Sequence, residues 1–122
     1  MLPFCRAQRL SRRGAFESWS VIVCCEENSR AQSFSRVLRC GRCTSILTAT
    51  TAAEVFGHSG KKVTHILSDD NIWSEPLLAE VRERFQLPVL RMEYLVSCLG
   101  AESPSTDAFD LKNHLQFRRR PQ

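Results

Sequence analysis

Short apolar runs alternate with longer amphipathic stretches along this chain, a pattern typical of strands separated by helices. Residues 19–25 form a compact run rich in β-branched side chains, too short for a buried helix and continuous enough for a strand covered on both faces. We expect this run to be the central strand of a sheet. Further short strands are expected at about 45–48, at 63–67 and, as an edge-like strand, at 88–90.

Apolar residues at helical spacing predict three helices. The first covers residues 31–40 and ends at Gly41, the second begins at Ser74 as N-cap with Pro76 in its first turn, and the last stops at Gly100. Their apolar stripes are Phe34, Val37 and Leu38; Leu77, Leu78, Val81 and Phe85; and Met92, Leu95, Val96 and Leu99. Residues 49–62 have little apolar periodicity, so we expect a long exposed connection with one helical turn around 52–56.

The element order is therefore β-α-β-β-α-β-α. Strands that alternate with helices favour a parallel sheet with helices on both faces, an α/β fold. A chain of 122 residues, 43% of them hydrophobic and 25% charged, fits one globular domain. We expect that domain at residues 17–115, between a basic N-terminal tail at 1–16 and a basic C-terminal tail at 116–122.

The positive charge lies mainly in the two tails. They hold seven basic residues and no acidic one, whereas the remaining residues hold ten basic and thirteen acidic ones, so the net positive charge lies in the tails and the expected domain is mildly acidic. Basic tails give salt-sensitive, sequence-independent attraction to phosphate backbones. They are equally typical of a nuclear-import signal or of ordinary solvated tails, and the Arg-rich, acid-free N-terminus also resembles a mitochondrial transit peptide weakened by Pro3.

Six cysteines are present, and Cys40 and Cys43 form a CxxC pair. A zinc site needs two further ligands, and neither a second CxxC nor an HxxxH is available. A redox CxxC opens a helix, whereas this pair closes one. We expect free structural thiols and no bound metal. A small zinc-stabilised nucleic-acid binder built on this pair is the alternative of another class, and a thiol oxidoreductase is a third.

Three local features resemble the BRCT domain family. Thr64 and His65 precede aliphatic residues in the third strand, Tyr94-x-x-x-Cys98 stands where that family usually carries Trp-x-x-x-Cys or Ser, and Gly41 follows the first helix. The stretch from residue 95 to 111 most resembles the N-terminal BRCT domain of family X DNA polymerases, such as terminal transferase and polymerase mu. The resemblance implies a four-stranded parallel sheet flanked by three helices, with these five residues in fold-defining packing positions.

The resemblance also implies a nuclear protein-interaction module of DNA repair rather than an enzyme. No Gly-rich phosphate loop, GxSxG or HExxH motif is present. In the polymerase relatives an Arg-bearing segment at the first helix helps dock the end-joining assembly of Ku, ligase and DNA. By resemblance only Arg30 matches that segment closely. The candidates for partner or DNA binding are the arginines that cluster on the first helix and its flanks, Arg30, Arg36, Arg39 and Arg42, with an ordinary solvated helix face as the simpler interpretation.

Phosphopeptide binding is disfavoured for this domain alone. BRCT domains that bind phosphoserine use a Ser or Thr after the first strand and a Lys at the start of the second helix. This sequence has Cys25-Glu26-Glu27 and Trp73-Ser74-Glu75 at roughly those places. Two glutamates repel a dianionic phosphate.

Overall fold

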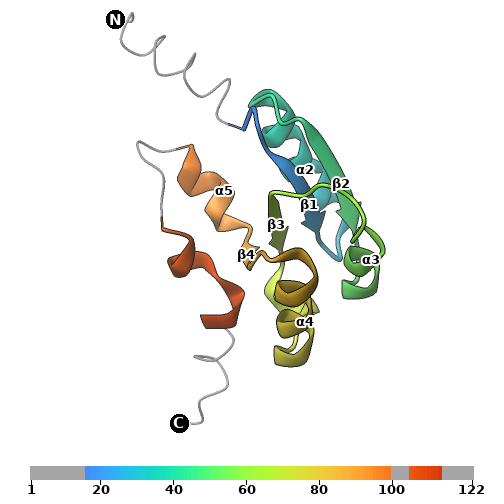
Figure 1. Ribbon diagram of the computed structural model, residues 1–122. Coiled ribbons are helices and arrows are strands. Elements are labelled where there is room, and N and C mark those ends of the chain that lie inside the picture. The colour runs from blue at the N-terminus through green and yellow to red at the C-terminus, as the bar shows by residue number, and fades with distance from the viewer. Residues whose placement is uncertain (1–15, 100–104, 114–122) are drawn as a thin grey trace, which may run out of the picture.

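The computed structural model describes residues 16–99 and 105–113, and the expectations for residues 1–15, for Gly100 and for the C-terminal tail concern residues outside these ranges. Four parallel strands form one sheet in the order β2-β1-β3-β4 (Figure 1). They are β1 (Ser20–Cys24), β2 (Ser45–Ala49), β3 (His65–Ser68) and β4 (Val89–Arg91). The prediction of a central first strand is confirmed, because β1 lies between β2 and β3 and its last four residues are buried. The α/β fold class is confirmed with it.

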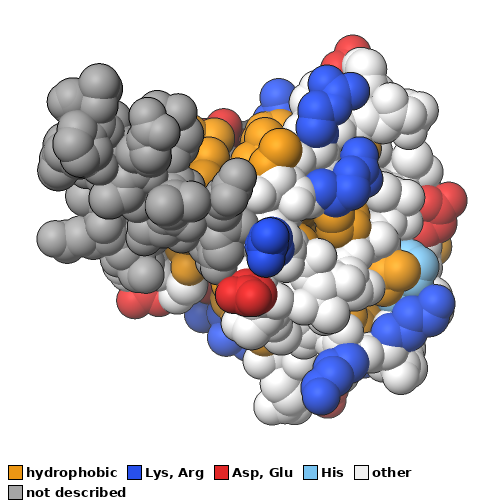
Figure 2. Space-filling model, turned by 90° about the horizontal axis from the view of Figure 1, so that it is seen from above, with side chains coloured by type: hydrophobic (Ala, Val, Ile, Leu, Met, Phe, Trp, Pro, Cys, Tyr) orange, Lys and Arg blue, Asp and Glu red, His pale blue; other side chains and the backbone are white. Residues whose placement is uncertain are grey.

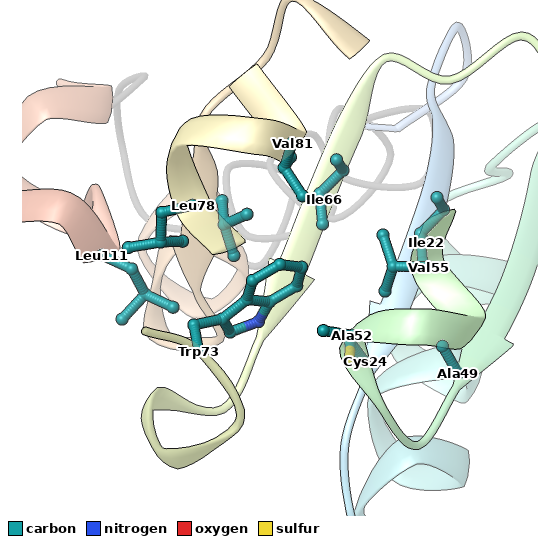
Figure 3. Close-up of a cluster of buried hydrophobic side chains, with 11 residues drawn as sticks. Ile22, Cys24, Ala49, Ala52, Val55, Ile66, Trp73, Leu78, Val81 and Leu111 are labelled. Atoms are coloured by element: carbon teal, nitrogen blue, oxygen red, sulfur yellow. The ribbon is translucent and has the colours of Figure 1, made fainter. Parts of the chain in front are cut away.

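Helices cover both faces of the sheet. They are α2 (Asn28–Cys40), α3 (Ala52–Gly57), α4 (Glu75–Phe85) and α5 (Glu93–Cys98), with short 3-10 helices η1 (Asp70–Ile72) and η2 (Thr106–Phe109). Buried residues of α3 and α4 share one core cluster with the sheet, and those of α2 and α5 share the other. Figure 3 shows Trp73 in the first cluster, with Leu78 and Leu111 on one side and Ala52 and Cys24 on the other. No helix within the described residues is long and apolar enough to cross a bilayer.

The connection between β2 and β3 is largely exposed, as expected, and contains the short helix α3. Thr51 caps α3 by accepting a hydrogen bond from the Glu54 N–H at 3.2 Å, and the Glu54 carboxylate accepts one from the Thr50 N–H at 2.7 Å. Val55 is fully buried against the sheet. The helical turn expected around 52–56 is confirmed by α3, whose six residues are too few to show a longer apolar periodicity in the sequence.

The end of α2 differs from the expected glycine cap. The Cys43 N–H donates to the Leu38 carbonyl and the Arg42 N–H to the Arg39 carbonyl, both at 3.0 Å, which is the hydrogen-bond pattern of a Schellman motif. Arg42, not Gly41, takes the left-handed conformation, with φ of 67°. Gly41 is required for another reason: a Cβ atom there would overlap the ring of Phe16.

Residues beyond the expected core also belong to the packed fold. The charge pattern places Phe16 in the N-terminal tail, yet its side chain is fully buried and its N–H donates to the Gly41 carbonyl at 3.0 Å. Near the other end, Asp110 forms an antiparallel bridge with Leu90 and an ion pair of 2.9 Å with Arg82. Leu111 is fully buried. The segment around residue 110 therefore lies along the outer edge of β4.

Candidate interaction surfaces

Thr64 joins β1 to β3 just before the third strand begins. Its hydroxyl oxygen accepts a hydrogen bond from the Ser20 N–H at 2.8 Å, and its own N–H donates to the Ser20 carbonyl at 2.7 Å. The Oγ1 also lies 2.8 Å from Nδ1 of His65, where the direction of the hydrogen bond depends on the histidine tautomer. Thr64 thus extends the ladder between the two strands and orients the next side chain.

His65 lies in a stack of aromatic rings. Its ring is 3.7 Å from that of Trp19, centroid to centroid, at an interplanar angle of 20°, and Tyr94 lies 6.2 Å from Trp19 in a nearly parallel plane. Burial lowers the pKa of His65 to about 4, because the interior disfavours the imidazolium. Burial, with a smaller effect from the neighbouring Cys98 thiol, raises the pKa of the Tyr94 hydroxyl. Tyr94 is buried, and the rings of His65 and Trp19 are partly buried beside it.

The four candidate arginines fall into two groups. Arg30 forms an ion pair of 2.9 Å with Asp69, and its guanidinium lies 5.3 Å from the centre of the Phe34 ring. Arg36, Arg39 and Arg42 are exposed at the other end of α2 and in the turn after it, and none of them forms an ion pair within the described residues. We call these three the α2 arginine surface. Figure 2, which views this end of the molecule from above, shows basic side chains interleaved with apolar ones.

Arg30 instead lines a groove at the carboxyl ends of the strands. In parallel sheets the loops that follow the strands meet at one edge, where ligands commonly bind. Here they enclose a groove of about 440 Å³. Its lining residues are Glu26, Glu27, Arg30, Ser68, Asp69, Asp70, Asn71, Arg91, Met92 and Glu93. We call it the strand-end groove.

The strand-end groove is acidic, and its two arginines are already paired. Arg91 Nε lies 3.6 Å from Asp70 and 3.7 Å from Glu93, both beyond hydrogen-bond length. Five carboxylates therefore face two arginines, which leaves the lining with an excess of negative charge. This negative charge would repel a phosphate dianion. The phosphate would also have to compete with Asp69 for Arg30.

Only some of the residues at the places of the expected phosphopeptide pocket line the strand-end groove. Glu26 and Glu27 line the groove, as their position after β1 indicates. Trp73 is buried, where its indole N–H donates to the Ser68 hydroxyl at 2.6 Å, and Glu75 lines a second cavity beside α4. The sequence reasoning missed Asp69, Asp70 and Glu93 as groove residues. Their position just after β3 and β4 is the signal that could have identified them.

The cysteines of the CxxC pair have different surroundings. Cys40 is exposed at the end of α2. The Cys43 thiol lies 3.2 Å from the Trp19 carbonyl oxygen and 3.3 Å from that of Ser45, between which it shares its one S–H, and burial raises its pKa. Within the described residues there is no group of three or more His, Cys, Asp or Glu that could hold a metal ion. Nothing in this geometry favours the zinc or thiol-redox alternatives.

Burial also suppresses the reactivity of the thiols behind the groove. It raises the pKa of Cys24 to about 11 and of Cys25 to about 12. Both side chains are fully buried. They remain protonated near neutral pH and are poor nucleophiles, because the thiolate is the reactive form.

Comparison with protein families places the chain among BRCT domains. The family described as TopBP1/SLF1, BRCT domain, matches residues 13–109. The chain therefore belongs to this family, and the expectation of a BRCT domain from the residues around Thr64 and Tyr94 is confirmed. No curated protein matches the chain. The expected likeness to the BRCT domain of family X polymerases stays a prediction, since the match is to the TopBP1/SLF1 type.

Proposed function

We propose that this chain is a non-catalytic protein-interaction module of the DNA damage response, active in the nucleus. Membership of the TopBP1/SLF1 BRCT family supports the general role, because BRCT domains are generally interaction modules. We choose the α2 arginine surface because its arginines are not ion-paired within the described residues, whereas Arg30 is. Arg30 is neutralised by Asp69, whereas Arg36, Arg39 and Arg42 remain exposed at one end of α2.

The α2 arginine surface suits an acidic partner or a nucleic-acid backbone. Guanidinium groups bind phosphate and carboxylate groups with paired hydrogen bonds, and exposed arginines need no rearrangement of the fold to do so. By resemblance to the polymerase domains, the partner is an end-joining assembly that contains Ku, ligase and DNA. The basic tails add sequence-independent attraction to the same DNA.

Reversing charge on this surface is expected to weaken DNA binding. The double variant Arg36→Glu, Arg39→Glu should lower affinity for duplex DNA by roughly tenfold or more at low salt, because two phosphate contacts are replaced by repulsion. The slope of log affinity against log salt should fall by about two. Fluorescence anisotropy with a labelled duplex measures both quantities.

The matched control makes the same charge change elsewhere. Lys61 and Lys62 are exposed in the connection between α3 and β3. Lys61→Glu, Lys62→Glu should reduce affinity much less than the arginine variant. Equal losses in the two variants would mean that net charge, and not the α2 arginine surface, governs DNA binding.

Partner binding is expected to be independent of phosphorylation. The strand-end groove carries Glu26, Glu27 and three further carboxylates, so a phosphorylated peptide gains no favourable charge there. Immobilised protein should capture the same partners from nuclear extract before and after phosphatase treatment, as compared by quantitative mass spectrometry. Loss of the main partners after phosphatase treatment would contradict this part of the proposal.

A further inference from the structure

One edge of the sheet is covered and the opposite edge is open. The segment around Asp110 lies along β4 through its bridge to Leu90. At the other side, β2 pairs only with β1 among the described strands. Figure 1 shows β2 at the margin of the sheet farthest from the C-terminal segment. An edge strand of this kind presents backbone N–H and C=O groups that can pair with a further strand.

The residues that face the open edge can be read from the hydrogen bonds of β2. The Ala49 carbonyl points toward β1, where it accepts from the Cys25 N–H at 3.0 Å. Successive residues of a strand direct their backbone groups to opposite sides. Leu47 therefore also faces β1, and Ile46 and Thr48 direct their N–H and C=O groups outward.

Two side chains of the α3 region confirm this direction and cover part of the edge. Nε2 of His58 lies 3.3 Å from the Thr48 carbonyl oxygen, and the Glu54 carboxylate accepts the Thr50 N–H at 2.7 Å. No such side-chain contact reaches the backbone groups of Ile46 or the N–H of Thr48 among the described residues. Within the described part of the chain, the outward backbone groups in the first half of the edge therefore have no hydrogen-bond partner. The Thr48 carbonyl keeps a second lone pair for another donor.

We propose that β2 pairs antiparallel with β2 of a second copy of this chain, about a two-fold axis beside Leu47. In that register Ile46 lies opposite the partner's Thr48 and exchanges two hydrogen bonds with it, and the symmetric pair exchanges two more. The four bonds use the outward groups of Ile46 and Thr48, and the contact of His58 with the Thr48 carbonyl is kept. The two sheets become one continuous sheet.

Charge at the ends of β2 favours a second copy as the occupant. Arg42 lies just before β2 begins, and Glu54 lies at its end, against Thr50. An antiparallel arrangement brings the start of one strand to the end of the other, so Arg42 of each copy faces the partner's Glu54. A parallel arrangement would bring like charges together. Because strands of five residues form a small interface, the association is weak.

The test is the oligomeric state of the full chain at increasing concentration. Sedimentation equilibrium from about 1 µM to about 1 mM should show a reversible monomer to dimer transition within that range. Thr48→Pro removes an outward N–H that the ladder with β1 does not use, so the fold tolerates it. It should raise the dimer dissociation constant about tenfold or more. A chain that stays monomeric throughout, or a Thr48→Pro variant that dimerises like the wild type, overturns the proposal.

A second substitution keeps the test valid if the proline variant misfolds. Thr48→Lys places a charge on the edge without constraining the backbone and should weaken the dimer to a similar extent. Gln32→Lys adds the same charge at an exposed position of α2 and should leave the dissociation constant unchanged. Equal effects of the two lysine variants would attribute the change to net charge and overturn pairing at this edge.

Mixing two charge variants tests the register. Arg42→Glu and Glu54→Arg should each dimerise more weakly alone, because like charges then face one another at both ends. A one-to-one mixture should restore association, since a mixed dimer has opposite charges at both contacts. Failure of the mixture to associate better than either variant, with both variants folded by circular dichroism, would reject this register.

Discussion

Acidification from pH 6.5 to pH 4 is expected to remove up to about 3 kcal/mol of folding stability through His65 alone. The unfolded chain has an ordinary histidine pKa of 6.5, and burial lowers the folded value to about 4. Between these values the unfolded state binds the extra proton, so stability rises with pH in this window and is full above pH 6.5. Urea unfolding measured at intervals of pH gives the slope directly.

The variant His65→Phe separates this effect from carboxylate titration. Phenylalanine keeps a ring beside Trp19 and cannot bind a proton. Its free energy of unfolding should therefore vary less between pH 6.5 and pH 4 than that of the wild type. Parallel losses in both proteins would show that groups other than His65 dominate the acid response.

Gly41→Ala is expected to destabilise the fold by about 1–3 kcal/mol, with a fall of roughly 5–15 °C in Tm. A Cβ at this position overlaps the Phe16 ring, which packs directly on the glycine backbone. The Phe16 side chain is fully buried, so moving the ring aside would disturb the residues packed around it. Thermal unfolding followed by circular dichroism measures the loss.

Two further variants identify the cause of that loss. A Cβ at Gly57, also at the end of a helix, would meet nothing within 4 Å, so Gly57→Ala should leave Tm nearly unchanged or raise it slightly. Phe16→Leu should reduce the cost of Gly41→Ala, so that the double variant is more stable than the sum of the single changes predicts. Strict additivity would place the strain somewhere other than the contact with Phe16.

The order of the elements was predictable because the sheet is parallel and buried on both faces. Continuous apolar runs such as residues 19–25 indicate strands of this type, and the stripe of Leu78 and Val81 indicates a helix packed on them. The packing around Phe16 was not predictable. It depends on a contact between residues 25 positions apart, and nothing in the local pattern distinguishes a buried phenylalanine from one in a tail.

The strand-end groove was also not predictable, because its residues are brought together by the fold and are not close in sequence. Asp69 and Asp70 have no third carboxylate close in sequence, so they indicate only a turn. Glu26 and Glu93 join them because the ends of parallel strands converge in space. The exposure of Arg36 and Arg39 follows from helical spacing, whereas the pairing of Arg30 depends on the position of β3.

The bridge between Leu90 and Asp110 determines where the chain can be shortened. The family match ends at residue 109, so a fragment cut there loses the Asp110 carboxylate that pairs with Arg82 and the buried side chain of Leu111. Its β4 would also become a second exposed edge, a known source of aggregation. The boundary suggested by homology is therefore shorter than the unit that folds, and a soluble expression fragment has to continue through Leu111.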